Sequence, residues 1–209
     1  MRGELTRDAI VAEAVRLVDA EGLARLTMRR LGGALGVEGM ALYHHVRDKD
    51  ELLQALAESV FTDPPAATGD WRADFRALSR ATRTDLNRHP ELFALAMTRP
   101  LTGPAALRNR EAQYAVLHAA GLRGARLLDA ARTWGAFLLG YAVVEHGARA
   151  AGRPLADWRP PPAAEFPLTA ALDEYQAGRS FDEQFEIGLD QVLVGLACPR
   201  RPGVAGLRS

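Results

Sequence analysis

Residues 27–49 carry few charges but gather side chains that hydrogen-bond well to a nucleic acid. The guanidinium of Arg29 can donate two parallel hydrogen bonds to one guanine in the major groove of DNA. Tyr43 and Lys49 carry a hydroxyl and an ammonium, which are groups that bind backbone phosphates. A surface that meets only water would rarely combine Met, Tyr and a pair of His residues with so little charge. These residue types indicate recognition of a DNA duplex.

Two short helices are expected to position these side chains. Thr27 is a candidate N-cap, because its hydroxyl can accept from a backbone N–H that the first helical turn leaves unpaired. Leu31 and Leu35 make one face of the first helix apolar, and Gly36 suits the left-handed residue that ends a helix. A second helix is predicted from about residue 38 to residue 45. Helix, glycine-containing turn and helix form the unit whose second helix lies in the major groove.

An ordinary αα-hairpin in a helical core is the alternative to this DNA-binding unit. It accounts for the inward residues Leu31, Leu35, Val37 and Leu42. It leaves unexplained the outward residues Gly39, Met40, Ala41, Tyr43, His44 and His45. We therefore favour the DNA-binding interpretation.

Residues 6–61 resemble the N-terminal domain of the TetR family of one-component transcriptional regulators. The matching pieces, in family order and spacing, are Ile10–Gly22, Leu26–Leu31, Leu35–Val37, Leu42–Val46 and Lys49–Leu53. The stretch Leu35-Gly-Val-Glu38, followed by Leu42-Tyr43, is similar to the tetracycline-repressor branch in particular. Where that branch often has Gln-Pro-Thr, this chain has Gly39-Met40-Ala41. This departure leaves the operator sequence open, but not DNA binding.

The resemblance assigns roles to the residues that match the family motif. Arg29 resembles the family's base-reading arginine. The residues expected to face base edges are Glu38, Gly39, Met40, Ala41 and His44. Those expected to contact phosphates are Thr27, Tyr43, His45 and Lys49.

The rest of the chain is predicted to be helical, because no alternating β pattern occurs in it. We expect an all-α protein with an N-terminal three-helix bundle containing the helix-turn-helix and a larger helical domain for ligand binding and dimerisation. The predicted division is a DNA-binding domain at 1–61, an effector-binding and dimerisation domain at 70–198, and a tail at 199–209. The segment between the domains, 62–69, is rich in Pro and other breakers.

Caps and breakers predict the helices individually. Thr6 and Gly22 bound the first helix, and a capping box at Asp48–Glu51 opens a fourth that ends near Phe61. Further helices are predicted at 70–88, from Pro90, at 104–119, at 124–150 and at 167–177, with a proline-rich loop at 152–165. A second capping box, Ser180–Glu183, opens the last helix, which ends near Leu196.

Apolar and aromatic residues at helical spacing in 70–150 are more often plain core than a ligand site, and the residues alone favour core. The resemblance implies instead an effector cavity there, because most family members bind a small molecule in this region. The candidate ligand-binding residues are Phe75, Leu78, Thr82, Leu86, Phe93, Met97, Tyr114, His118, Trp134, Phe137 and Tyr141. Leu95 falls where the tetracycline repressor has its metal-binding histidine, so we expect no metal and no cofactor.

The helix predicted at 124–150 is apolar on more than one side, as a helix is when it meets a partner chain. With the last helix it offers the seam of a four-helix bundle, as in family homodimers. The alternative is that both faces are buried within one subunit.

Composition bounds the class of protein. The chain has 209 residues, 48% of them hydrophobic, with a formal net charge of zero, which argues against indiscriminate coating of nucleic acid. Residues 22–49 carry five basic and two acidic side chains, a local excess of three. No signal peptide and no membrane-length apolar run is evident, and a single cysteine, Cys198, fits a reducing compartment, so we expect a cytoplasmic protein.

No nucleophile–base pair, phosphate-binding glycine loop or metal-ligand spacing predicts an enzyme. We expect a ligand-responsive transcriptional regulator, a repressor that binds a palindromic operator as a homodimer and is released by a small-molecule effector. The alternative is a ligand-independent, architectural DNA-binding protein.

Overall fold

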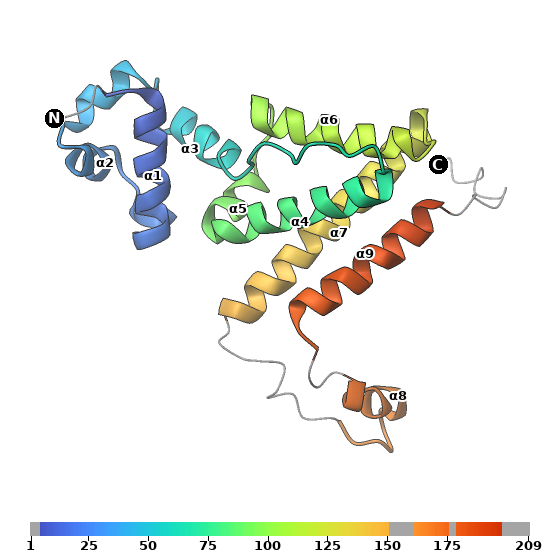
Figure 1. The fold of residues 1–209 in the computed structure, drawn as a ribbon. Coiled ribbons are helices and arrows are strands. Elements are labelled where there is room, and N and C mark those ends of the chain that lie inside the picture. The colour runs from blue at the N-terminus through green and yellow to red at the C-terminus, as the bar shows by residue number, and fades with distance from the viewer. Residues whose placement is uncertain (1–4, 151–160, 176–178, 198–209) are drawn as a thin grey trace, which may run out of the picture. The chain divides into compact units, whose positions relative to one another are not determined.

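The computed structural model describes residues 5–150, 161–175 and 179–197, and these form helices and connecting turns with no strand among them (Figure 1). The expected all-α fold is confirmed. Predictions for most of the 152–165 loop, for the end of the 167–177 helix and for Cys198 and the tail lie outside the described residues.

The chain divides into two compact units. One comprises residues 1–67 and 77–115, and the other residues 68–76 and 116–209. The fourth α-helix, α4 (Trp71–Arg88), contributes to both units. The predicted division into domains at 1–61 and 70–198 stays a prediction.

The first unit begins with α1 (Arg7–Glu21), the 3₁₀ turn η1 (Leu23–Arg25), α2 (Met28–Leu35), the 3₁₀ helix η2 (Gly39–His44) and α3 (Lys49–Glu58) (Figure 1). The end of α4, α5 (Pro90–Ala96) and most of α6 (Pro104–Ala119) complete it.

Side-chain caps fix where these helices start, as the sequence predicts. The hydroxyl of Thr6 accepts from Ala9 N–H, and that of Thr27 accepts from Arg30 N–H at 3.1 Å. At the other end of α2, Gly36 adopts a left-handed conformation with φ of 71°, which is why a glycine stands there.

A compact apolar core joins the helices of this N-terminal region. Its fully buried members include Ile10, Leu31, Leu42, Leu52 and Leu56, and each stabilises the fold by about 1.5–3 kcal/mol relative to an exposed side chain. The core therefore fixes α1, α2, η2 and α3 against one another as one rigid body. We call these four elements the reading head.

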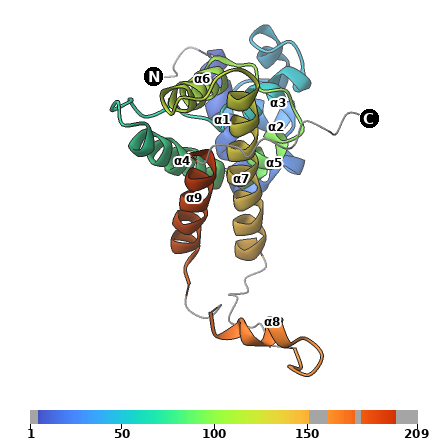
Figure 2. The same cartoon turned by 90° about the vertical axis from the view of Figure 1, so that its right-hand side faces the viewer.

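The second unit contains the start of α4, α7 (Gly124–Ala150), α8 (Pro167–Ala171), the 3₁₀ turn η4 (Asp173–Tyr175) and α9 (Phe181–Ala197). In both views α7 and α9 lie side by side (Figures 1 and 2). Phe75 packs on Trp134 with ring centroids 4.3 Å apart, and Phe185 of α9 lies 5.7 Å from Phe137 and 5.2 Å from Tyr141. These rings form the core of the unit.

α7 is long enough for a membrane-spanning role to be considered. It has 27 residues and an 18-residue window of mean hydropathy 1.2, so by length and composition alone it passes the criterion for a spanning helix. A core helix of a soluble protein passes the same test. Glu145 of α7 is fully buried, and it accepts at 2.6 Å from Arg149 of the same helix, whose side chain is 59% exposed.

Candidate DNA-binding surface

Two glycines bring the two helices of the helix-turn-helix into backbone contact. A Cβ placed on Gly32 of α2 would lie 2.8 Å from the nitrogen of Gly39 and 2.9 Å from its Cα. A Cβ placed on Gly39 would lie 3.1 Å from the carbonyl oxygen of Met28 and 3.2 Å from the Cα of Arg29. The crossing of α2 and η2 is therefore set by the close approach of their backbones. A residue larger than glycine at either position would displace the neighbouring backbone.

The predicted recognition helix is shorter and tighter than expected. Residues 39–44 form a 3₁₀ helix, with Ala41 N–H donating to the carbonyl of Glu38 at 3.0 Å. Leu42 is the one fully buried residue of η2, and it anchors the helix to the core. A short helix with a single buried anchor leaves most of its surface outward.

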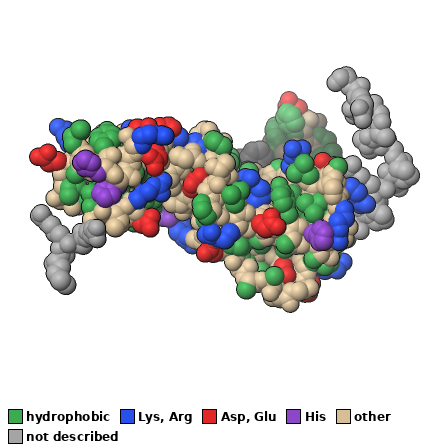
Figure 3. Space-filling model, turned by 90° about the horizontal axis from the view of Figure 1, so that it is seen from above, with side chains coloured by type: hydrophobic (Ala, Val, Ile, Leu, Met, Phe, Trp, Pro, Cys, Tyr) green, Lys and Arg blue, Asp and Glu red, His purple; other side chains and the backbone are tan. Residues whose placement is uncertain are grey.

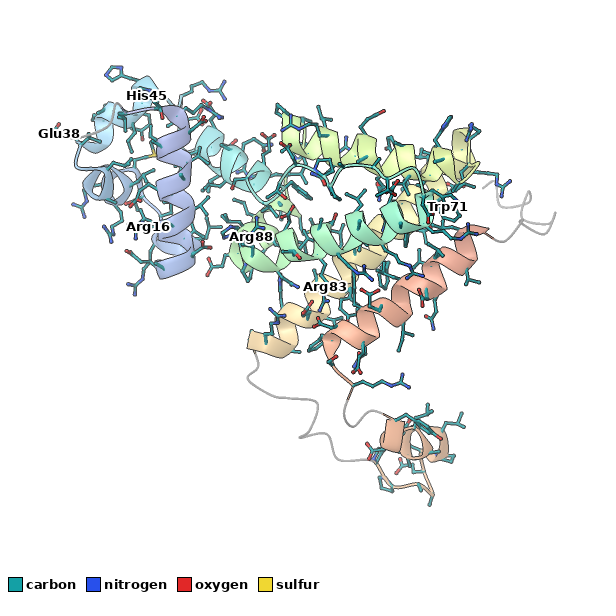
Figure 4. All side chains as sticks on the ribbon, in the orientation of Figure 1. Arg16, Glu38, His45, Trp71, Arg83 and Arg88 are labelled. Carbon is teal, nitrogen blue, oxygen red and sulfur yellow. The ribbon has the colours of Figure 1, made fainter. Side chains whose placement is uncertain are left out.

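The predicted reading residues lie on this outer surface. Met40 is 71% exposed and Tyr43 is 41% exposed. Gly39, Ala41 and His45 are half-buried, while the remaining candidates are exposed, namely Thr27, Arg29, Glu38, His44 and Lys49. Figure 3 shows histidine side chains on the exposed surface of the N-terminal unit, with basic and acidic side chains around them. In Figure 4 the labelled Glu38 and His45 project from its outer edge.

Ion pairing distinguishes the basic residues near the helix-turn-helix. Arg30 forms a bidentate pair with Glu21 that lowers the pKa of that carboxylate, and Arg47 pairs with Asp48. Arg29 and Lys49 have no ion pair among the described residues. Their charges therefore remain available to a partner outside the chain.

A capping arrangement holds the start of α3, where Lys49 is the first residue. Asp48 accepts from Glu51 N–H at 2.8 Å, and this hydrogen bond, together with Arg47, lowers the pKa of Asp48. Glu51 in turn accepts from the N–H of Arg47 at 2.8 Å. In a standard capping box this return bond would go to the N-cap residue itself, one position later. α3 ends at Glu58, earlier than the predicted end near Phe61.

Polar contacts that the sequence does not reveal tie the reading head to α5 and to the segment after it. Asp50 of α3 accepts from Arg99 at 2.6 Å, which lowers the pKa of Asp50, and Gln54 donates to the carbonyl of Pro100 at 2.7 Å. The carboxylate of Glu91 accepts from Leu23 N–H. These contacts join residues far apart in the chain.

The segment after α3 is tied to α4 in a similar way. Asp85, which is only 3% exposed, accepts from both the N–H and the hydroxyl of Thr62 at 2.8–3.0 Å. Asn109 of α6 donates to the carbonyl of the same Thr62. No spacing rule relates these positions, so sequence reasoning missed them.

The candidate effector residues fall in both units. Leu78, Thr82, Leu86, Phe93, Met97 and Tyr114 belong to the first, and Phe75, His118, Trp134, Phe137 and Tyr141 to the second. Most of them are buried or half-buried, whereas Met97 and His118 are exposed. The aromatic residues of the second unit pack on one another and on α9, as a core does. Their contact with an effector stays a prediction. Among the described residues, no group of three or more His, Cys, Asp or Glu is placed to hold a metal ion.

Comparison with known proteins connects both parts of the chain to one family. The sequence model described as "Bacterial regulatory proteins, tetR family" matches residues 10–56, and "Tetracyclin repressor-like, C-terminal domain" matches residues 63–199. The HTH-type transcriptional repressor DrrR1 of Streptomyces coeruleorubidus is 34% identical, covering 92% of this chain and 77% of its own length. The tetracycline repressor class A from transposon 1721 of Escherichia coli is 32% identical, covering 93% and 91%.

Solved structures agree with this assignment. The transcriptional regulator SCO7222, a TetR protein of Streptomyces coelicolor, superposes with a TM-score of 0.80 at 28% identity and covers 93% of this chain and 98% of its own. ActR from the same organism, solved in complex with actinorhodin, has a TM-score of 0.77 at 28% identity and covers 93% and 97%. The chain therefore belongs to the TetR family, whose members are DNA-binding transcriptional regulators and not enzymes.

Proposed function

We propose that the protein is a homodimeric repressor that binds a palindromic operator through α2 and η2 and is released by a small-molecule effector. The observation that carries this proposal is the reading surface. Arg29 and Lys49 are exposed and have no ion pair among the described residues, while the backbone of Arg29 lies against Gly39 and Lys49 begins α3 directly after the Asp48 cap. Preorganised donors on a rigid frame are what sequence-specific recognition needs.

Each reading residue has a proposed contact. Arg29 donates to guanine in the major groove, and Met40 and Ala41 contact thymine methyl groups. Glu38, Gly39 and His44 face base edges, whereas Thr27, Tyr43, His45 and Lys49 contact phosphates. Thr27 serves in two roles, because its oxygen accepts from Arg30 N–H while its hydroxyl proton can still be donated.

A second copy of the chain is proposed to cover the outer face of α7 and α9. Val144 and Val194 are 63% and 68% exposed, and a Cβ on Gly140, Gly147 or Gly195 would meet nothing within 4 Å. A groove of about 440 Å³ runs between the two helices, lined by residues such as Thr133, Phe137, Gly188 and Gln191. Exposed apolar and small residues let partner helices approach closely in a four-helix bundle, and two-fold pairing places two reading heads about 34–36 Å apart.

The effector is proposed to bind at the candidate residues named from the sequence. ActR binds actinorhodin, which supports a ligand response here rather than an architectural role. The contacts of α3 with Arg99 and Pro100 give such a response a route, because movement of α5 or the following turn would pull on α3. Thr62, which follows α3, is held by Asp85 of α4. The factor by which the effector lowers operator affinity equals the ratio of the effector's affinities for the free and the DNA-bound protein.

A DNA-binding regulator of this kind acts in the cytoplasm.

Operator binding and dimerisation can be tested together. A random duplex pool is selected with the full-length protein, and the enriched site is tested by electrophoretic shift, alongside sedimentation of the free protein. We expect a palindromic site and a dimer that Val194→Asp dissociates with loss of operator affinity, while Leu107→Asp, an exposed position on α6, leaves both unchanged. A monomeric wild type that shifts every duplex equally would contradict the proposal.

The ligand response needs its own test. Actinorhodin and tetracycline, named in the descriptions of two relatives, are the first probes of a wider panel. A compound that weakens operator binding by the ratio of its affinities for free and DNA-bound protein supports the mechanism. A compound that binds the protein with equal affinity in both states supports the architectural alternative.

A further inference from the structure

The carboxylate of Glu38 makes no stabilising contact with the described residues of the chain. Glu38 is the N-cap residue of η2, yet its side chain makes no capping hydrogen bond. It is exposed, it has no ion pair among the described residues, and it projects from the outer edge of the unit (Figure 4). An acidic group on a surface that approaches phosphates weakens DNA binding through like-charge repulsion. A favourable partner for this carboxylate must therefore be a hydrogen-bond donor on the DNA.

The chemistry of the bases leaves one hydrogen-bond donor in the major groove that suits a carboxylate. In the major groove, only adenine N6 and cytosine N4 donate hydrogen bonds. Adenine presents its donor beside the N7 acceptor, which suits the amide of Asn or Gln, whereas a carboxylate can only accept. Cytosine presents the N4 donor, and Glu or Asp is the side chain that fits it.

The position of Glu38 relative to Arg29 completes the match. The residue after Glu38, Gly39, packs so closely on α2 that its Cβ would lie 3.2 Å from the Cα and nitrogen of Arg29. The two side chains therefore start from adjoining backbone, and they form no ion pair with each other. Side by side they present donors and an acceptor, which complement the O6 and N7 of guanine and the N4 of cytosine.

We propose that Glu38 is a specificity-determining residue that accepts a hydrogen bond from the N4 amine of a cytosine, next to the guanine bound by Arg29, in each operator half-site. This inference rests on the proposed DNA-binding function and deepens it. The same carboxylate repels phosphates and base acceptors wherever no cytosine is present, so it penalises incorrect sites as well as favouring the correct one.

Selection from a random duplex pool tests the role of Glu38 on the protein side. The full-length wild type is compared with Glu38→Ala, with Glu38→Gln and with Glu111→Ala, which removes an exposed acid from α6. We expect the wild type to fix a cytosine that Glu38→Ala no longer prefers, with discrimination at that position reduced about 5- to 150-fold, the equivalent of about 1–3 kcal/mol for one good base contact. Nonspecific affinity rises in Glu38→Ala, Glu38→Gln shifts the preference towards adenine, and Glu111→Ala keeps the wild-type site.

A modified base tests the same contact without changing the protein. N4-methylcytosine at the fixed position should weaken binding of the wild type and leave Glu38→Ala unaffected. Tighter binding of Glu38→Ala to every duplex with unchanged preference would show a merely solvated charge and overturn the inference. A wild type that enriches no sequence at all would overturn the proposed function and the inference together, whereas a selected site without this cytosine overturns the inference alone. Circular dichroism verifies that each variant is folded.

Discussion

Neighbouring glycines in α2 offer a matched test of how the helix-turn-helix is built. Alanine at Gly32 places a methyl group 2.8–2.9 Å from the backbone nitrogen and Cα of Gly39 and from the carbonyl oxygen of Val37. Alanine at Gly33, one residue later in the same helix, meets nothing within 4 Å. Neither glycine has a positive φ, so the two substitutions differ in packing and not in backbone strain.

The difference between the two variants isolates the packing contribution. Both gain about 1 kcal/mol of helix propensity on replacing Gly by Ala, and this gain cancels in the comparison. Overpacking a well-packed site costs about 1–3 kcal/mol, and the atoms struck here are backbone, which cannot turn aside as a side chain can. We therefore expect Gly32→Ala to be less stable than Gly33→Ala by about 1–3 kcal/mol, with Gly33→Ala at least as stable as the wild type.

Urea denaturation followed by far-ultraviolet circular dichroism measures this difference, and titration of each variant with the selected operator measures its consequence. Because the methyl group at Gly32 displaces η2, Gly32→Ala should also lose operator affinity, while Gly33→Ala retains it. Equal stability and equal operator affinity of the two variants would refute the close crossing of α2 and η2.

Other predictions concern charged side chains of both units. Arg29→Ala should lose the preference for guanine at the position that Arg29 contacts, whereas Arg30→Ala should keep the sequence preference of the wild type, because Arg30 is already committed to the carboxylate of Glu21; competition titrations with specific and nonspecific duplexes separate the two. Lys49→Ala should make the slope of log affinity against log salt shallower by about 2 for a dimer, one phosphate contact in each subunit, and an unchanged slope would exclude a phosphate contact. Hydrogen bonds from the Thr68 N–H and hydroxyl lower the pKa of Asp74 below its ordinary 3.8, so its stabilisation is complete above that value and is lost as the pH falls through the lower folded pKa. Asp74→Asn should therefore flatten the acid limb of a stability–pH profile, and a limb of unchanged steepness would count against this role.

Local signals allowed most of the fold to be predicted. The N-caps at Thr6 and Thr27 accept the hydrogen bonds that their positions imply, and the predicted helices at 104–119 and 124–150 match α6 and α7. The capping box at Ser180 forms both of its reciprocal bonds with Glu183. Caps and breakers act within a few residues, so a sequence displays them directly.

Contacts between distant segments could not be predicted in this way. Gly39 has a structural role that the sequence did not reveal, which is the close approach of η2 to Gly32, and its place facing base edges stays a prediction. The ties of Asp85 to Thr62 and of Glu91 to Leu23 join residues that no periodicity relates. The family resemblance supplied the reading residues, and the structure adds which of their charges have no ion-pair partner among the described residues.

Titration of the wild type with its selected palindrome and with a scrambled duplex of the same composition, at near-physiological salt, tests most directly whether the surface of α2 and η2 reads sequence. We predict tighter binding to the palindrome by a factor of about 10³ or more, which Arg29→Ala reduces. Equal affinity for the two duplexes, falling together as salt is raised, would contradict the account.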